Sequence, residues 1–157
     1  MGYSMRVNWS FILILTFASA CQLGRPPASG SVFRVGAVVA PVVEPGVEDA
    51  LRVGLAAALA AQGALGNRDA LDVNLTVISA STSPTQIGAN GQIHTAYLRI
   101  SAQAGERKTR LSAERQYSVL APEQADTART AAFNALAATL TADTVQWMRY
   151  APDGEGP

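Results

Sequence analysis

The stretch AYLRISAQAGERKTRLSAERQY, residues 96–117, decides the fold of this chain. Apolar and polar residues alternate on both sides of its single glycine, and a period of two is typical of antiparallel strands joined by a turn. We take Gly105-Glu106-Arg107-Lys108 as a four-residue turn. One face then pairs Ala102 with Leu111, Ile100 with Ala113 and Ala96 with Tyr117. The other face pairs Gln103 with Arg110, Ser101 with Ser112, Arg99 with Glu114 and Tyr97 with Gln116.

This register separates apolar from polar side chains on both strands, and a one-residue slip would mix the two faces. The sequence therefore predicts a hairpin with one buried face. Arg115 is the exception, because it falls on the apolar face opposite Leu98. We expect Arg115 near a sheet edge or beneath a helix end, with its stem buried and its charged head in solvent.

The residues before the hairpin predict a strand, a helix and a second strand. Residues 32–43 are apolar and rich in valine, as in a strand, and Glu44-Pro45-Gly46 turns the chain. Residues 47–62 carry apolar side chains at steps of three and four, with Gly63 at the expected position after a helix. Residues 71–77 alternate as a half-buried strand, and the polar segment 79–91 predicts a loop.

A second helix is predicted from Pro122 to about Met148. Pro122 suits a first helical turn, and one apolar stripe follows along the segment. The stripe consists of Phe133, Leu136, Leu140 and Trp147. The order β-α-β-β-β-α predicts an α+β fold: a two-layer sandwich with two helices packed on one face of a small four-stranded sheet.

The N-terminal residues predict an exported protein. Arg6 provides a positive charge, and the apolar run 11–17 has the length of a signal-peptide core but is too short to span a membrane. Ala18-Ser19-Ala20-Cys21 resembles a bacterial lipobox, in which the cysteine is acylated and becomes the new N-terminus. The same bond suits ordinary signal peptidase, so both forms of processing stay open. Either Met1 or Met5 could be the first residue.

These features divide the chain into four parts. Residues 1–20 are a signal peptide, 21–31 a lipidated cysteine with a flexible tether, 32–150 a single α+β domain, and 151–157 a disordered tail. The residue after the cysteine is Gln22 and not aspartate. By resemblance to lipoprotein sorting in Gram-negative bacteria, this implies a lipid-anchored protein on the periplasmic face of the outer membrane.

Composition excludes several classes of function. Twelve basic and twelve acidic residues give no net charge, which argues against nucleic-acid binding. One cysteine and one histidine allow neither an internal disulfide nor a His/Cys metal site, and no cofactor motif is present. His94 has no recognisable catalytic partner, and the carboxylates form no pair at a spacing suited to acid–base chemistry. We expect the protein not to be an enzyme.

Basic residues are concentrated at Arg107-Lys108-Thr109-Arg110. This segment is either a solvated turn or a contact for an anion, because guanidinium groups match the geometry of phosphate. At an outer membrane, the natural anion is the phosphorylated head of lipopolysaccharide.

The organisation of the chain resembles the LPS-assembly lipoprotein family, LptE. The similar segments are VVAPVVEPGVEDALRVGLAAAL, residues 38–59, and RQYSVLAPEQADTARTAAFNALAATL, residues 115–140. The resemblance implies a non-enzymatic lipoprotein that plugs the outer-membrane β-barrel protein LptD and assists lipopolysaccharide assembly at the cell surface. Arg107, Lys108 and Arg110 are the nearest equivalents of that family's lipopolysaccharide-binding residues.

Two other functional classes stay open at this point. The first is an envelope lipoprotein that regulates a cell-wall synthase or accompanies a secretion pore. The second is an envelope enzyme, which would need His94 in a pocket beside a carboxylate.

Overall fold

The computed structural model describes residues 32–41, 44–66, 69–88 and 91–150. The predicted signal peptide, Cys21, the tether and the tail 151–157 lie outside the described residues. Among the helices that are described, none has the length and apolarity needed to cross a membrane.

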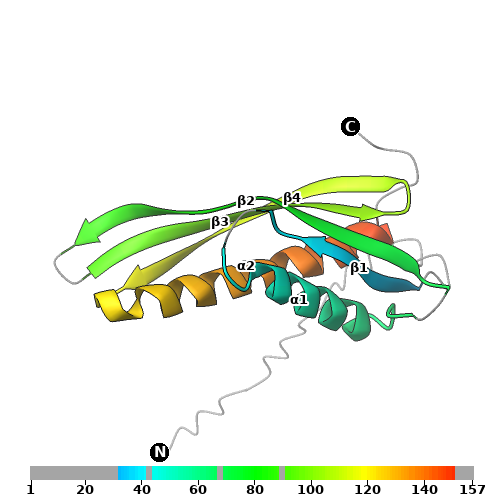
Figure 1. Cartoon of the computed structure of the whole chain (residues 1–157), viewed down its shortest axis with the longest axis horizontal. Coiled ribbons are helices and arrows are strands. Elements are labelled where there is room, and N and C mark those ends of the chain that lie inside the picture. Colours follow the sequence, from blue (N-terminus) through cyan, green and yellow to red (C-terminus); the bar gives the residue numbers. More distant parts are fainter. Residues whose placement is uncertain (1–31, 42–43, 67–68, 89–90, 151–157) are drawn as a thin grey trace, which may run out of the picture.

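Two helices cover one face of a four-stranded sheet (Figure 1). β1 is parallel to β2, whereas β2, β3 and β4 are antiparallel, and the strands lie in the order β1-β2-β3-β4. This arrangement confirms the predicted α+β sandwich. In chain order the elements are β1 (Phe33–Val39), α1 (Val47–Ala61), β2 (Leu71–Gly88), β3 (Gly91–Ala104), β4 (Arg107–Val119), the short 3₁₀ helix η1 (Pro122–Gln124) and α2 (Ala125–Tyr150).

The first helix forms as predicted and ends one residue earlier. Gly46 precedes it with a φ of 82°, and Gly63 follows it with a φ of 61°; both values suit glycine because it has no Cβ. The residues that face the sheet are spaced by four, as on one side of an α-helix. They are Val47, Leu51, Leu55 and Leu59, and all four are buried.

The second helix carries the predicted apolar stripe. Phe133, Leu136 and Leu140 are buried, and Trp147 packs half-buried against the same core. η1 occupies the predicted start, so the α-helix begins at Ala125 and continues to Tyr150. The two helices pack closely, since a Cβ on Gly54 of α1 would lie 2.9 Å from Oγ1 of Thr141.

The β3–β4 hairpin turns over two residues, so the predicted four-residue turn is wrong. Ala104 pairs with Arg107, and Gly105 has a φ of 61°, which fits the first central position of a type II′ turn. Every partner on β4 therefore lies two positions from its predicted place. The observed pairs include Ile100–Leu111, Leu98–Ala113, Ala96–Arg115, His94–Tyr117, Gln103–Lys108, Ser101–Arg110, Arg99–Ser112 and Tyr97–Glu114.

The two faces of the hairpin are nevertheless those predicted, because a shift of two residues leaves each side chain on its own side of the sheet. Arg115 lies opposite Ala96 and not Leu98. It is exposed, and β4 is an edge strand, as expected for this charge.

The described residues of the predicted loop 79–91 belong to strands, 79–88 to β2 and Gly91 to β3. β2 continues to Gly88, pairs with β3 from Val73 to Gly88, and breaks register at two places, between Val77 and Ser79 and between Pro84 and Gln86. Pairing with β3 satisfies the backbone of this polar segment, which sequence pattern alone does not reveal. Because β2 extends beyond α1, the sheet is long and narrow (Figure 1).

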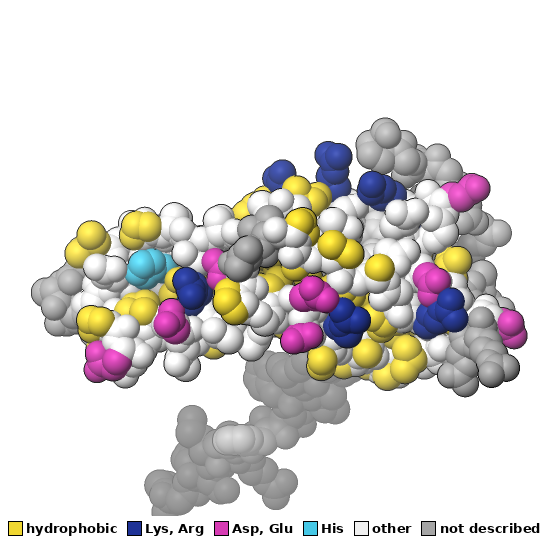
Figure 2. All heavy atoms as spheres, in the orientation of Figure 1, with side chains coloured by type: hydrophobic (Ala, Val, Ile, Leu, Met, Phe, Trp, Pro, Cys, Tyr) yellow, Lys and Arg dark blue, Asp and Glu magenta, His cyan; other side chains and the backbone are white. Residues whose placement is uncertain are grey.

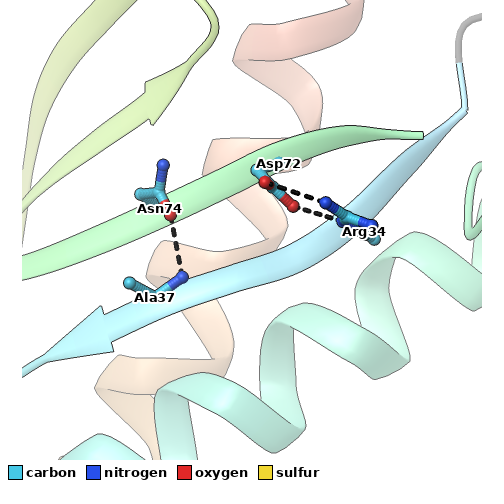
Figure 3. A network of polar contacts seen from close by, with 4 residues as sticks. All are labelled: Arg34, Ala37, Asp72 and Asn74. Atoms are coloured by element: carbon cyan, nitrogen blue, oxygen red, sulfur yellow. Dashed lines mark hydrogen bonds and ion pairs between the residues drawn. The ribbon is translucent and has the colours of Figure 1, made fainter. Parts of the chain in front are cut away.

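A polar network holds β1 to β2 (Figure 3). Arg34 forms an ion pair with Asp72, and the amide of Ala37 donates to Oδ1 of Asn74 at 2.8 Å. β1 shifts register between Val35 and Val38, and the Asn74 amide occupies the space beside Gly36. β1 is also shorter than the predicted strand 32–43, since it ends two residues before Pro41, which has no amide hydrogen.

Candidate functional site

The face of the sheet opposite the helices carries a hollow of about 400 Å³. Side chains that point away from the core alternate with buried ones along each strand, and this alternation supplies its lining. The lining residues are Asn74, Thr76 and Ile78 of β2, Arg99, Ser101 and Gln103 of β3, and Lys108 and Arg110 of β4.

The strand register arranges these residues in rows across the sheet. Lys108 lies opposite Gln103, which lies opposite Asn74. Arg110 lies opposite Ser101, and Arg99 is one row further along β3. Three cations therefore surround a floor of amide and hydroxyl groups. Dark blue side chains project from this side of the molecule, away from the helices (Figure 2).

The three cations of the hollow are exposed, and in the described part of the chain no ion pair involves any of them. Arg99 donates from Nε to the hydroxyl of Tyr97 at 3.1 Å, with its guanidinium carbon 5.7 Å from the Tyr97 ring centre. This contact orients Arg99 but leaves its charge uncompensated. Two guanidinium groups and one ammonium group above hydroxyl and amide donors suit an anion with several oxygens, such as a phosphate.

Arg107 does not join the other predicted basic residues, because neighbouring strand residues point to opposite faces. Its guanidinium reaches the helix layer and donates to the carbonyl oxygens of Met148 at 3.2 Å and Trp147 at 3.3 Å. It also stands over the Trp147 ring, 5.0 Å from the centre. A cation at this position complements the negative end of the α2 dipole. The structure thus brings Lys108 and Arg110 together and separates Arg107 from them.

Arg99 is the residue that the sequence prediction of the site missed. The predicted four-residue turn places Arg99 on the polar face opposite Glu114. The observed two-residue turn pairs Arg99 with Ser112 instead and places it diagonal to both Arg110 and Glu114. The sequence did contain a signal for the two-residue turn: Gly105 is directly followed by a charged residue. Glycine at the first central position favours a two-residue hairpin loop.

His94 lies on the helix-facing side of β3. Its Nε2 is 3.1 Å from Oε1 of Gln92, and its ring stacks on Tyr117 with centres 5.4 Å apart. Gln92 lies on the same strand as His94, whereas the stacking on Tyr117 joins β3 to β4; both contacts are typical of packing. Within the described ranges, no three histidine, cysteine, aspartate or glutamate residues group as a metal site. Cys21, the predicted lipid-attachment residue, lies outside the described residues.

Comparisons with known proteins concern the fold. No protein-family model matches the sequence, and no curated protein matches it either. Among solved structures, the chain is similar to a minor lipoprotein from Acinetobacter baumannii, with a TM-score of 0.50 and 15% sequence identity over 76% of this chain and 93% of that chain. The rare lipoprotein B from Shewanella oneidensis gives a TM-score of 0.44 and 9% identity over 73% of this chain and 92% of that one. At 15% identity, the Acinetobacter likeness shows a shared fold.

Proposed function

We propose that the chain is a non-enzymatic outer-membrane lipoprotein that binds lipopolysaccharide and assists its assembly at the cell surface. The hollow lined by Arg99, Lys108 and Arg110 carries this proposal, because it presents three exposed cations on one sheet, none of them in an ion pair with another described residue. The exported N-terminus with Cys21 supports the lipoprotein part. The fold shared with the minor lipoprotein from Acinetobacter baumannii is consistent with it.

The hollow suits a phosphorylated sugar better than a small reactive substrate. Its cations project into solvent from the open face of the sheet, Arg99 from β3 and Lys108 and Arg110 from β4. They can therefore attract an anion without enclosing it. Hydroxyl and amide groups of Ser101, Gln103 and Asn74 add donors and acceptors for sugar hydroxyls. Binding without enclosure suits a protein that passes its ligand on.

The resemblance to the LPS-assembly lipoprotein family makes a large outer-membrane β-barrel such as LptD the proposed partner. Affinity purification of the tagged full chain from solubilised membranes, followed by mass spectrometry, tests this role. Recovery of a large β-barrel protein in near-equal amount supports it. Recovery of a cell-wall synthase, of a secretion pore, or of no protein contradicts it.

Binding to purified lipopolysaccharide tests the hollow itself. Replacing Arg99, Lys108 and Arg110 together with serine should weaken binding at least tenfold, a loss of about 1.4 kcal/mol. Arg52→Ser is the matched control, because Arg52 is an exposed cation on α1, where it pairs with Glu48 at 2.6 Å. Equal affinities of the triple variant and the control would refute the hollow as the binding surface.

A further inference from the structure

Exposed apolar side chains gather at the end of the molecule where β1 and β2 begin. Val32, Leu65 and Leu71 are 40%, 48% and 45% exposed. The backbone holds them side by side: the Leu71 amide donates to the Val32 carbonyl at 3.0 Å, and Phe33 pairs with Leu65 on one side and Leu71 on the other. We refer to Val32, Leu65 and Leu71 as the apolar end.

Aromatic and basic groups border the apolar end. Leu71 lies against the β3–β4 turn, because a Cβ on Gly105 would be 3.5 Å from its Cδ1. Arg107 and Trp147 follow on the same side, and Tyr150, the last residue of α2, is 60% exposed. The start of β1, the end of α2 and the β3–β4 turn meet at the right of Figure 1. Apolar side chains bordered by aromatic and basic ones are typical of surfaces at a membrane–water interface.

The chain also enters the domain at this end. Ten residues, 22–31, separate Cys21 from Val32. The eleven peptide steps between these two residues can span at most roughly 40 Å. Along β2, Ile87 at the opposite end of the sheet lies about 50 Å from Leu71. When the long axis of the sheet stands perpendicular to the bilayer that holds Cys21, the tether therefore allows the apolar end, but not the Ile87 end, to contact the lipid surface.

We propose that the apolar end docks on the lipid surface that holds Cys21, with Val32, Leu65 and Leu71 among the lipid headgroups and upper acyl chains. The inference rests on the proposed lipid anchor. Removal of apolar surface from water drives the docking, and the anchor supplies a high local concentration of lipid. Lys108 lies close to the β3–β4 turn, so docking would hold the basic hollow beside the membrane.

Fluorescence of Trp147 tests the docking. The chain has two tryptophans, Trp9 and Trp147, so Trp9→Phe leaves one reporter close to the apolar end. The protein with this change is isolated from whole cells, and its mass shows whether Cys21 is acylated. Acylated protein is reconstituted into vesicles of phosphatidylethanolamine and phosphatidylglycerol. Protein with a free thiol is coupled through Cys21 to a maleimide phospholipid in the same vesicles. The mass thus tests the anchor, and the fluorescence tests the docking independently.

Phospholipids brominated high in the acyl chains should quench Trp147 strongly compared with unbrominated lipids. Leu65→Ser combined with Leu71→Ser should abolish the quenching. The matched control is Ile87→Ser combined with Leu120→Ser, because these residues are 76% and 71% exposed and lie at the opposite end. The control pair should retain the quenching.

Absence of quenching in the chain with Trp9→Phe alone would overturn the proposal. Undiminished quenching in the Leu65/Leu71 pair would also overturn it, since the tether alone would then explain the proximity. A dimer that protects the apolar end without lipid contact would identify a second copy as its occupant. If the serine pair fails to fold, two single-tryptophan variants test the docking instead. Leu71→Trp and Ile87→Trp are each introduced separately into a chain that carries Trp9→Phe and Trp147→Phe. Only the reporter at position 71 should then be quenched, and equal signals from both would refute docking.

Discussion

Arg107→Ala removes the guanidinium that holds the end of α2 against β4. Two carbonyl acceptors, at 3.2 Å and 3.3 Å, and the Trp147 ring at 5.0 Å lose their partner. Hydrogen bonds to charged groups contribute about 1.5–3 kcal/mol when formed. Arg107 is only half-buried, so water replaces part of this interaction. We expect a net loss of about 2 kcal/mol in the free energy of unfolding, which lowers Tm by roughly 5–10 °C in a domain of this size.

Thermal and urea unfolding followed by circular dichroism measure this loss. Lys108→Ala is the matched control, because Lys108 is the neighbouring cation on the opposite face of the sheet. It should change stability by less than about 0.5 kcal/mol. Affinity for lipopolysaccharide should show the reverse order, with Lys108→Ala weaker and Arg107→Ala close to the unmodified chain. Equal stability losses in the two variants, or weaker binding only in Arg107→Ala, would refute the assignment of Arg107 to the helix layer.

Three further changes probe the core, the edge strand and its ion pair. Phe133→Ala should cost about 3–5 kcal/mol of stability, and a loss below about 1 kcal/mol in urea unfolding would contradict its burial. Gly36→Ala should cost about 1–3 kcal/mol, because its Cβ would lie 2.4 Å from Oδ1 of Asn74 and displace the side-chain amide that accepts from the Ala37 backbone. The double variant with Asn74→Ala should cost little more than either single variant, and additive losses would argue against this clash. The hydrogen bond from Arg34 lowers the pKa of the Asp72 carboxyl, so the ion pair stabilises the fold above the ordinary carboxyl pKa and this stabilisation is lost as pH falls through the lowered value. The difference in unfolding free energy between the unmodified chain and Asp72→Asn, measured in urea between pH 7 and pH 2, should shrink with acid, and a constant difference would exclude this linkage.

Much of the fold follows from local pattern. Leu51, Leu55 and Leu59 repeat at helical spacing between two glycines, so α1 was predicted within one residue. The alternation in residues 96–117 separates a buried face from an exposed one, and the structure keeps both faces. The long polar half of β2 has no such pattern, because it lies beyond α1 and both of its faces are polar or partly exposed. Its strand conformation depends on hydrogen bonds to β3 that are distant in sequence.

The site was predictable only in part. Lys108 and Arg110 stand out as basic residues two positions apart, and a period of two places them on one face of any strand. The same period places Arg107 on the opposite face, but a four-residue turn hides this by leaving Arg107 and Lys108 outside the strand. Arg99 joins the cations through the register of β3 against β4, which a change of two residues in the turn alters.

By itself, the sequence predicted export, and it determined that the domain is an α+β sandwich and which side chains face the core. These properties depend on local composition and periodicity, which each segment carries with it. Only the tertiary structure decided which charges become neighbours: Arg107 with the end of α2, and Arg99 with Lys108 and Arg110 over the hollow. It also brought Val32, Leu65 and Leu71 together at one end. Such groupings depend on strand register and on where helices end, and both are set by packing between segments that are far apart in the chain.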